Sequence, residues 1–92
     1  MKIFIYLIKS LKDNNYYCGI TRNLIKRLKE HNSGKVKITA KKRPFNLVYF
    51  KGHQNYQEAR KHEKWLKKKN RDYKDKLIAL AQLAPPITGG VK

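Results

Sequence analysis

Residues 2–9 constrain the fold of this chain more than any other segment. They read Lys-Ile-Phe-Ile-Tyr-Leu-Ile-Lys, a short apolar run that is rich in β-branched and aromatic side chains. Such a run, without alternation between apolar and polar side chains, is typical of a strand that is buried on both faces. We therefore expect this strand to lie within a sheet that is covered on both sides.

A β-hairpin is predicted to follow. Residues 10–15 include Asp and Asn, which tolerate left-handed backbone and bond to their own main chain, so they indicate a turn. Residues 16–20 are predicted to form the second strand, and we expect Tyr6 to pair near Tyr17. Along this strand Tyr17 and Gly19 share one face. A glycine within a strand predicts a bulge or a close approach of another backbone.

Capping residues and apolar spacing predict the remaining elements. Thr21 or Asn23 is suited to cap a helix over about 23–32, and Gly34 is suited to end it. Asn55 is suited to cap a second helix. The other expected elements are a basic loop over 35–44, a strand over 46–51 and helices over about 56–69 and 72–83.

The order strand, strand, helix, strand, helix, helix predicts the α+β class. The simplest architecture for this order is a small three-stranded, mainly antiparallel sheet flanked by helices. A chain of 92 residues has room for one thin core, so we expect one domain over residues 1–83. Residues 84–92 contain two prolines and two glycines and are expected to form a disordered tail.

Positive charge is the strongest global feature of the sequence. The chain has 23 Lys and Arg residues against 6 Asp and Glu, a formal net charge of +17. Solubility requires a net charge of only about 2–8 on a small domain, so this excess favours a nucleic-acid partner. The alternative is a basic structural protein or one that lies at an anionic membrane surface. Within the basic loop, the expected nucleic-acid contacts are Lys35, Lys37, Lys41, Lys42 and Arg43.

The chain is predicted to act in the cytoplasm, without a membrane partner. The apolar run at 3–8 is shorter than the roughly 7–15 apolar residues of a signal peptide, and no small-residue cleavage site follows it. No stretch approaches the roughly 20 apolar residues of a membrane span. Cys18 is the single cysteine, so no internal disulfide can form, which is consistent with a reducing compartment.

Among the six carboxylates, Glu63 is the candidate metal ligand. At about 100° per residue it lies between Tyr56 and Ala59 and near Leu66, on the side of its helix that faces the core. A carboxylate there is costly without a partner, which is either an ordinary Lys or a hard cation such as Mg²⁺. One inward carboxylate is too few for two-metal chemistry. Glu30, by contrast, is expected to face solvent.

Arg27 and His31 are candidates for phosphate binding and proton transfer. They are four residues apart and share a helix face that borders the apolar stripe of Leu24 and Leu28. Arg presents a planar fork of donors that suits phosphate oxygens, and His exchanges protons near neutral pH. The alternative is that both are ordinary surface residues of a basic helix.

Taken together, these positions resemble the GIY-YIG nuclease family over about residues 2–80. The motif residues are Ile5-Tyr6, ten further residues, Tyr17-Cys18-Gly19, and then Arg27, His31 and Glu63. The stretches that are similar to the short stand-alone bacterial members are 17–24, 27–28, 31–34, Pro44, 47–49, 58–60 and 63–64. Phe4 stands where the first motif usually has Gly, and Cys18 replaces Ile in the second. Asn70 is the one candidate for the family's late Asn.

The resemblance implies a role for each matching residue. Tyr6 and Tyr17 would line the site, whereas alone they would be assigned to the core, and one of them would help to activate the attacking water. Arg27 would hold the scissile phosphate, and His31 would assist proton transfer or bind phosphate. Glu63 would ligate one divalent cation, Mg²⁺ or else Mn²⁺.

The activity that the resemblance implies is hydrolysis of a nucleic-acid phosphodiester at a single-metal site, with DNA favoured over RNA. Gly19 would let the substrate backbone approach. A Tyr base, with its ordinary pKa of about 10, would need a lowered pKa, which the metal or the surrounding Lys and Arg could supply. The protein would act as a monomer or a weak homodimer. The alternative function is a non-catalytic, basic nucleic-acid-binding module on the same fold.

Overall fold

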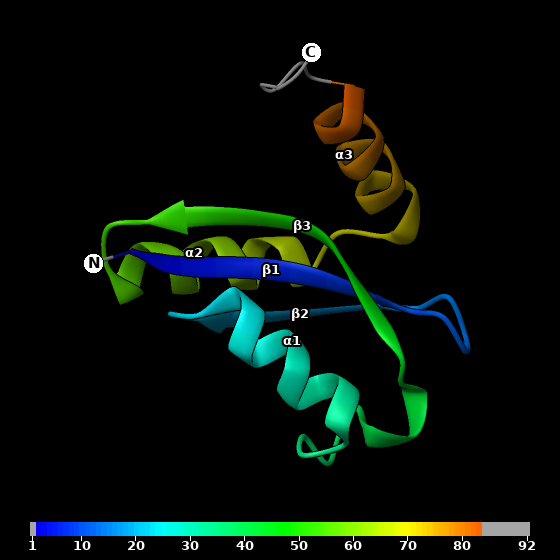
Figure 1. Cartoon of the computed structure of the whole chain (residues 1–92). Coiled ribbons are helices and arrows are strands. Elements are labelled where there is room, and N and C mark those ends of the chain that lie inside the picture. The colour runs from blue at the N-terminus through cyan, green and yellow to red at the C-terminus, as the bar shows by residue number, and fades with distance from the viewer. Residues whose placement is uncertain (1, 84–92) are drawn as a thin grey trace.

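The computed structural model describes residues 2–83, so the predicted tail at 84–92 lies outside the described residues. The predicted order of strands and helices is confirmed, and the class is α+β. The basic loop differs from its prediction, because residues 40–42 within it form one turn of 3₁₀ helix. The elements are β1 (Ile3–Ser10), β2 (Tyr16–Thr21), α1 (Leu24–Ser33), η1 (Ala40–Lys42), β3 (Phe45–His53), α2 (Tyr56–Lys67) and α3 (Arg71–Leu83) (Figure 1).

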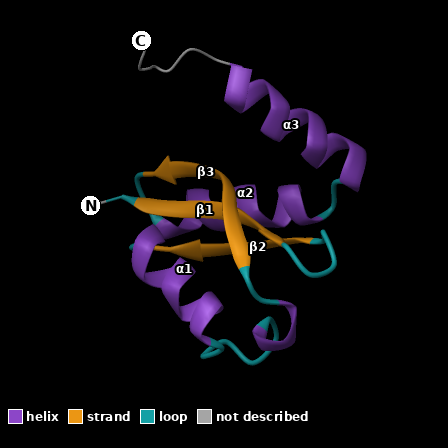
Figure 2. Cartoon of the chain, turned by 45° about the vertical axis from the view of Figure 1, so that its right-hand side comes forward, coloured by secondary structure: helices purple, strands orange, loops and turns teal. Residues whose placement is uncertain are grey.

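The three strands form one antiparallel sheet in the order β2–β1–β3, so β1 is the central strand. Helix α1 covers one face of the sheet and α2 covers the other (Figures 1 and 2). Helix α3 stands at one end of the molecule, on the side of β3 (Figure 2). The predicted three-stranded sheet between helical layers is confirmed.

The register of the hairpin differs from the prediction by two residues. Tyr6 pairs with Gly19, and not with Tyr17. The turn reverses later than expected because Ser10 holds it: the amide of Asn14, whose φ is 62°, donates to the Ser10 carbonyl at 2.9 Å. Since side chains alternate along a strand, Tyr6, Tyr17 and Gly19 still lie on one face, the face that α1 covers.

Helices α1 and α2 begin at the capping residues that the sequence offers. Of the two candidates for α1, Asn23 is the cap, and its side chain accepts a hydrogen bond from the Lys26 amide at 3.0 Å. Gly34 ends this helix in the left-handed conformation, with a φ of 85°. Asn55 caps α2 in the same way as Asn23 caps α1. These caps fix the rotation of both helices and therefore which side chains face the sheet.

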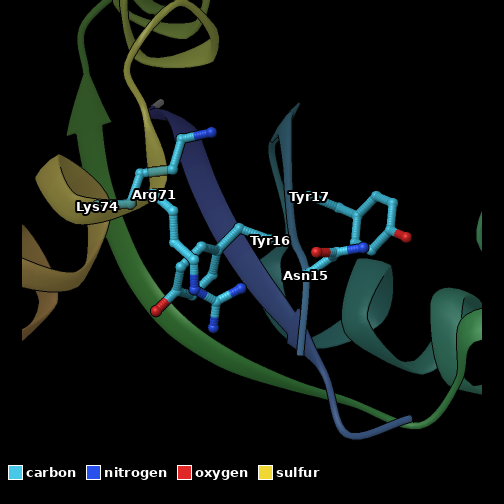
Figure 3. A pocket seen from close by; sticks show the side chains of 5 residues that line it. All are labelled: Asn15, Tyr16, Tyr17, Arg71 and Lys74. Atoms are coloured by element: carbon cyan, nitrogen blue, oxygen red, sulfur yellow. The ribbon is translucent and has the colours of Figure 1, made fainter. Parts of the chain in front are cut away.

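Helix α3 is fastened to the β1–β2 turn by Arg71. Its Nη1 donates to the carbonyl oxygen of Asn14 at 2.6 Å, and its guanidinium lies over the ring of Tyr16, 5.1 Å from the ring centroid (Figure 3). The Tyr16 hydroxyl in turn donates to Asp75. These contacts place the first turns of α3 beside the start of β2.

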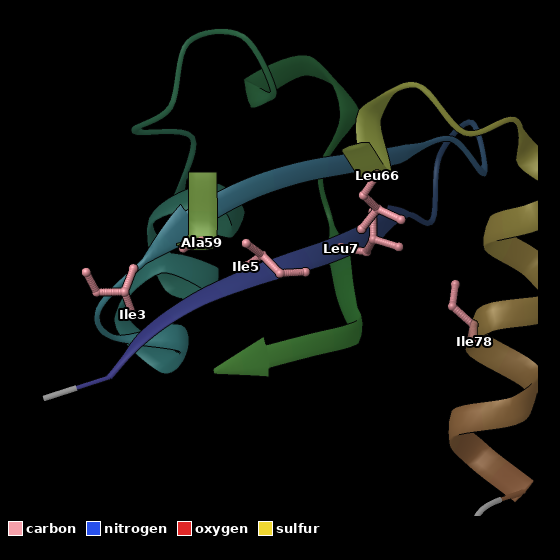
Figure 4. Close-up of a cluster of buried hydrophobic side chains, with 6 residues drawn as sticks. All are labelled: Ile3, Ile5, Leu7, Ala59, Leu66 and Ile78. Carbon is pink, nitrogen blue, oxygen red and sulfur yellow. The ribbon is translucent and has the colours of Figure 1, made fainter. Parts of the chain in front are cut away.

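The hydrophobic core lies on both faces of β1, as predicted for its uninterrupted apolar run. Ile3, Ile5 and Leu7 point toward α2 and form one cluster with Ala59, Leu66 and Ile78 (Figure 4). Tyr6 and Ile8 point toward α1 and pack with Phe45. Each fully buried Ile or Leu stabilises the fold by about 1.5–3 kcal/mol. A Tyr with a polar hydroxyl is therefore held in the middle of the best-packed strand.

Candidate active site

The face of the sheet that α1 covers carries a chain of hydrogen-bonded polar side chains. Tyr6 is 4% exposed, and its hydroxyl oxygen lies 2.9 Å from Nε2 of His31. Nε of Arg27 donates to the same hydroxyl at 3.4 Å. Nδ1 of His31 lies 2.7 Å from Oγ1 of Thr39, and both of these residues are 4% exposed. The sequence-predicted residues Tyr6, Arg27 and His31 thus form one connected group.

The partners of Thr39 set the direction of this chain. The His31 tautomer with its proton on Nδ1 satisfies all of these contacts together: the Thr39 hydroxyl donates to the carbonyl oxygen of Val36 at 3.4 Å, and its oxygen accepts from Nδ1–H. Nε2 of the neutral imidazole then carries the lone pair and accepts from the Tyr6 hydroxyl. The proton of Tyr6 therefore points at His31, while its oxygen accepts from Arg27.

Burial sets the protonation states of these groups. It raises the pKa of Tyr6, although the hydrogen bond and the charge of Arg27 act in the opposite direction. Burial also lowers the pKa of His31, and the positive charge of Arg27 lowers it further. A protonated phenol thus faces a neutral imidazole near neutral pH. The expectation that surrounding Lys and Arg would lower a Tyr pKa is wrong for Tyr6, because desolvation outweighs their charge.

Arg27 joins this buried chain to the surface. Its Nη1 lies 3.0 Å from Oε1 of Glu30, and the two side chains are 37% and 27% exposed. Glu30 is predicted to face solvent, and its partly exposed carboxylate agrees with that, although it turns along α1 to the guanidinium. This pair holds Arg27 in place and leaves part of its donor fork available to a ligand.

These groups open into a hollow of about 510 Å³. Tyr6, Tyr17, Arg27 and His31 all line it, so the structure brings four of the predicted site residues together. The Tyr17 hydroxyl also donates to Oδ2 of Asp13 at 3.5 Å. The remaining lining residues are Tyr16, Cys18, Val36, Ile38, Thr39, Lys67 and Lys74.

Glu63 lies on α2, the helix on the opposite face of the sheet from α1, and it is not among the residues that line this hollow. It is 8% exposed, which confirms its predicted inward orientation. Its carboxylate pairs with Lys67 at 3.4 Å and with Arg60 at 3.9 Å. Burial and then the negative charge of Glu63 raise the pKa of the Cys18 thiol to about 11. Glu63 therefore lies close to two residues, Cys18 and Lys67, that line the hollow.

Glu63 offers a single carboxylate that could serve as one ligand to a hard divalent cation. Its two basic neighbours, Lys67 and Arg60, have side chains that are 56% and 51% exposed, so both can turn to water when a cation binds. No group of three or more His, Cys, Asp or Glu side chains within residues 2–83 could hold an ion. Water and phosphate oxygens would therefore complete the coordination.

Gly19 supports the site from β2. A Cβ at this position would lie 2.6 Å from Cζ of Tyr6 and would also meet its hydroxyl, so only Gly lets the Tyr6 ring cross the strand. The predicted close approach differs in kind, because the group that packs against this glycine is the Tyr6 side chain and not another backbone. An approach of substrate to Gly19 stays a prediction.

The basic loop runs along the rim of the hollow. Val36, Ile38 and Thr39 line the hollow, and the five predicted nucleic-acid contacts of the loop are exposed: Lys35, Lys37, Lys41, Lys42 and Arg43. Lys42 pairs with Asp13 at 3.2 Å. Binding of nucleic acid by these side chains stays a prediction.

Sequence reasoning missed Thr39, Lys67 and Lys74. Lys67 follows Glu63 by four residues, and this helical spacing could have identified it as a neighbour. Thr39 carries no such signal, because a Thr in an irregular basic loop has no periodicity that predicts burial. Lys74 reaches the hollow only through the position of α3.

The sequence profile of the GIY-YIG catalytic domain matches residues 2–76 of this chain. The chain belongs to the GIY-YIG family. It is 42% identical over 77 residues to a UPF0213 protein of Clostridium perfringens, an alignment that covers 83% of this chain and 82% of that protein. It is 40% identical over 76 residues to the UPF0213 protein YazA of Bacillus subtilis, with 82% of this chain and 76% of YazA covered.

A solved structure shows the same fold. The solution NMR structure of a UPF0213 protein from Bacillus halodurans superposes with a TM-score of 0.55 at 33% identity, covering 87% of this chain and 85% of the other. GIY-YIG proteins are a nuclease family, so membership indicates nuclease-type chemistry and a nucleic-acid partner. No helix within residues 2–83 is both long and apolar enough to cross a membrane.

Proposed function

We propose that this protein is a metal-dependent nuclease that hydrolyses nucleic-acid phosphodiester bonds, DNA in preference to RNA, at a single-metal site. The observation that carries this proposal is the chain of hydrogen bonds from Arg27 through Tyr6 to His31, which opens into one hollow. Phosphodiester hydrolysis requires removal of a proton from water and neutralisation of charge on the phosphoryl group. The same chain of side chains offers a group for each task.

The proton of the attacking water is removed by Tyr6 and His31 acting together. The water oxygen attacks phosphorus and gives its proton to the Tyr6 oxygen, while Tyr6 passes its own proton to Nε2 of His31. Tyr6 remains neutral throughout, so its raised pKa is no obstacle. Thr39 holds His31 in the tautomer that can accept this proton. Tyr17, on the same hollow, orients the water or the phosphate.

Two groups would stabilise charge on the phosphoryl group. Arg27, which lines the hollow, donates to the phosphoryl oxygens, and Glu63, beside the lining residues Cys18 and Lys67, would hold one divalent cation, Mg²⁺ or Mn²⁺. When bound, this ion supplies positive charge to the departing oxygen. The exposed cations of the basic loop hold the phosphate backbone, which gives affinity without reading the bases.

The decisive experiment is a gel cleavage assay on single- and double-stranded DNA and RNA, with Mg²⁺, Mn²⁺ or EDTA. The wild-type protein is expected to cut only with a divalent ion. Arg27→Ala and Glu63→Ala are each expected to cut about 10²–10³-fold more slowly while still binding the substrate, because each loses one source of charge stabilisation.

Two surface residues of the same helices provide matched controls. Lys29→Ala removes an exposed cation from α1, and Glu58→Ala removes an exposed carboxylate from α2. Both are expected to cut at the wild-type rate. Equal rates for Arg27→Ala, Glu63→Ala and the wild type would contradict the proposed site. Salt-dependent binding by clean wild-type protein, with no product in any metal, would favour the non-catalytic binding module instead.

A further inference from the structure

A second pocket adjoins the hollow at the start of β2. It has a volume of about 280 Å³ and is lined by Asn15, Tyr16, Tyr17, Arg71 and Lys74 (Figure 3). Tyr16, Tyr17 and Lys74 also line the larger hollow, so the two spaces share a wall. We call this space the α3 pocket, because Arg71 and Lys74 both come from that helix.

The α3 pocket is suited to an anion. Each of its five lining side chains can donate hydrogen bonds, and two of them are cations. No carboxylate is among its lining residues. Two acids adjoin its lining residues, and both already have partners. Asp75 is engaged by the Tyr16 hydroxyl and lies 3.8 Å from Nε of Arg71. Asp13 accepts from the Asn15 amide at 3.0 Å and from the Tyr17 hydroxyl at 3.5 Å, and it pairs with Lys42.

Arg71 is held in position before any ligand arrives. Its Nη1 bond to the Asn14 carbonyl and its place over the Tyr16 ring fix the plane of the guanidinium. Within residues 2–83, Nη2 of Arg71 forms no hydrogen bond, so it remains available to a ligand. A pre-oriented guanidinium loses little conformational freedom when it binds a phosphate.

The cations of this region are arranged in a row and do not converge on one point. The Arg71 guanidinium and the Lys74 ammonium point away from each other along β2 (Figure 3). Lys74 also reaches the larger hollow, where Lys67 is the next cation. A row of separate cations suits successive phosphates of one strand better than a single phosphate group.

We propose that the α3 pocket is a second phosphate subsite, which binds the same nucleic-acid strand beside the bond that is cut. This inference rests on the proposed function and names its substrate more closely. The substrate is a strand of several nucleotides that passes from Arg27 along β2 to Arg71. A small phosphodiester fills the hollow alone and gains nothing from Arg71.

The test compares two substrates in Arg71→Ala, since Arg71 lines only the α3 pocket. For a fluorescent single-stranded DNA oligonucleotide, KM is expected to rise about 10-fold, the usual range for one charge-assisted contact. Hydrolysis of bis(p-nitrophenyl) phosphate is expected to stay at the wild-type rate. Binding of the oligonucleotide is measured in EDTA by fluorescence anisotropy. The slope of log Kd against log salt concentration is expected to be smaller than that of the wild type by about 0.7, the value for one lost phosphate contact on a single strand.

Lys76→Ala is the matched control, because Lys76 is an exposed cation of α3 that lines neither space. It is expected to leave KM unchanged, and an Arg71→Ala variant that behaves like it on the oligonucleotide would overturn the subsite. If Arg71→Ala fails to fold, the Arg71→Lys variant is measured instead. It keeps the positive charge and therefore the salt slope, but its KM is expected to rise about threefold because an ammonium cannot replace the two-pronged guanidinium. An unchanged KM would overturn the subsite.

The two proposals fail in distinguishable ways. A wild-type protein that hydrolyses neither substrate in any metal would remove the nuclease proposal. The salt slopes of Arg71→Ala and Lys76→Ala, which need no catalysis, would still decide whether the α3 pocket binds a strand. Cleavage by the wild type together with equal salt slopes would retain the nuclease and remove the subsite.

Discussion

The two faces of the sheet hold their polar groups in different ways. On the face that α1 covers, Tyr6, His31 and Thr39 are buried and joined by hydrogen bonds of 2.7 and 2.9 Å. On the face that α2 covers, Glu63 is also buried, but its pairs with Lys67 and Arg60 are 3.4 and 3.9 Å long. The polar side chains of the first face are therefore held in one fixed arrangement. The charged side chains around Glu63 on the second face can exchange partners.

This difference matches two needs of the proposed reaction. Proton transfer depends steeply on distance and direction, so its groups benefit from being fixed in advance. Binding of a cation requires a carboxylate that can release one positive partner and accept another. Helix α1 supplies the first property through buried hydrogen bonds, and α2 supplies the second through half-exposed Lys67 and Arg60 side chains.

The largest expected effect that tests this comparison is in His31→Ala. Without the imidazole, Tyr6 has no acceptor for its proton, so the rate of DNA cleavage is expected to fall about 10²–10⁴-fold. The measurement is single-turnover cleavage in Mg²⁺, with circular dichroism as the check on folding. His53→Ala is the control, because His53 bonds to His62 and is outside the hollow. A folded His31→Ala variant with the wild-type rate would show that the α1 face does not move the proton.

A smaller effect is expected where the α1 face is overpacked. In Gly19→Ala the new Cβ displaces the Tyr6 ring, which is expected to lower the free energy of unfolding by about 1–3 kcal/mol. Urea denaturation measures this change. Gly52→Ala is the matched control in β3, because its Cβ would meet the flexible Lys2 side chain at 3.0 Å and the edge of the Phe4 ring at 3.2 Å, both longer than the contacts at Gly19, and we expect a smaller change of about 0.5 kcal/mol. Equal losses in the two variants would mean that Tyr6 is not tightly held.

The smallest expected effect is on the pH dependence of stability. Because burial and Arg27 hold the pKa of His31 below its ordinary value of 6.5, the unfolded chain takes up a proton that the folded chain does not. The contribution of His31 to the free energy of unfolding is therefore fully present above pH 6.5. It is lost as the pH falls through the lower pKa that His31 has in the folded protein. Urea midpoints between about pH 8 and pH 5 measure this loss.

A His31→Gln variant isolates the pH-dependent contribution of His31 to stability, since Gln does not titrate. Burial and the nearby His53 also lower the pKa of His62, so some loss of stability at low pH remains in the variant. The variant is expected to lose less stability over this range than the wild type. An identical pH dependence would mean that His31 is not held neutral by burial.

The fold was predictable because it depends on patterns that a sequence displays directly. The apolar run of β1, the caps Asn23 and Asn55 and the stop at Gly34 each act within a few residues, and the structure confirms all of them. The hairpin register was missed because it depends on which turn hydrogen bonds Ser10 makes. Alternative turns of this length differ little in energy, and the pattern of apolar and polar residues does not show which one forms.

The candidate site was less predictable than the fold. Periodicity placed Glu63 inward and put Arg27 on the same face as His31, but only the family resemblance suggested that they act together. The burial of Thr39, and therefore the tautomer of His31, depends on the path of an irregular loop. The upward shift of the Tyr6 pKa follows from desolvation, which depends on neighbours that are distant in sequence.

The position of Tyr6 at the centre of β1 also links the proposed catalysis to completion of folding. Its partners Arg27 and His31 come from α1, Thr39 behind His31 comes from the basic loop, and Glu63 comes from α2, so the candidate site is assembled from distant parts of the chain. A nascent or partly unfolded molecule lacks the aligned groups, even when individual helices have formed. On the proposed function, cutting ability would therefore arise only with the finished sheet.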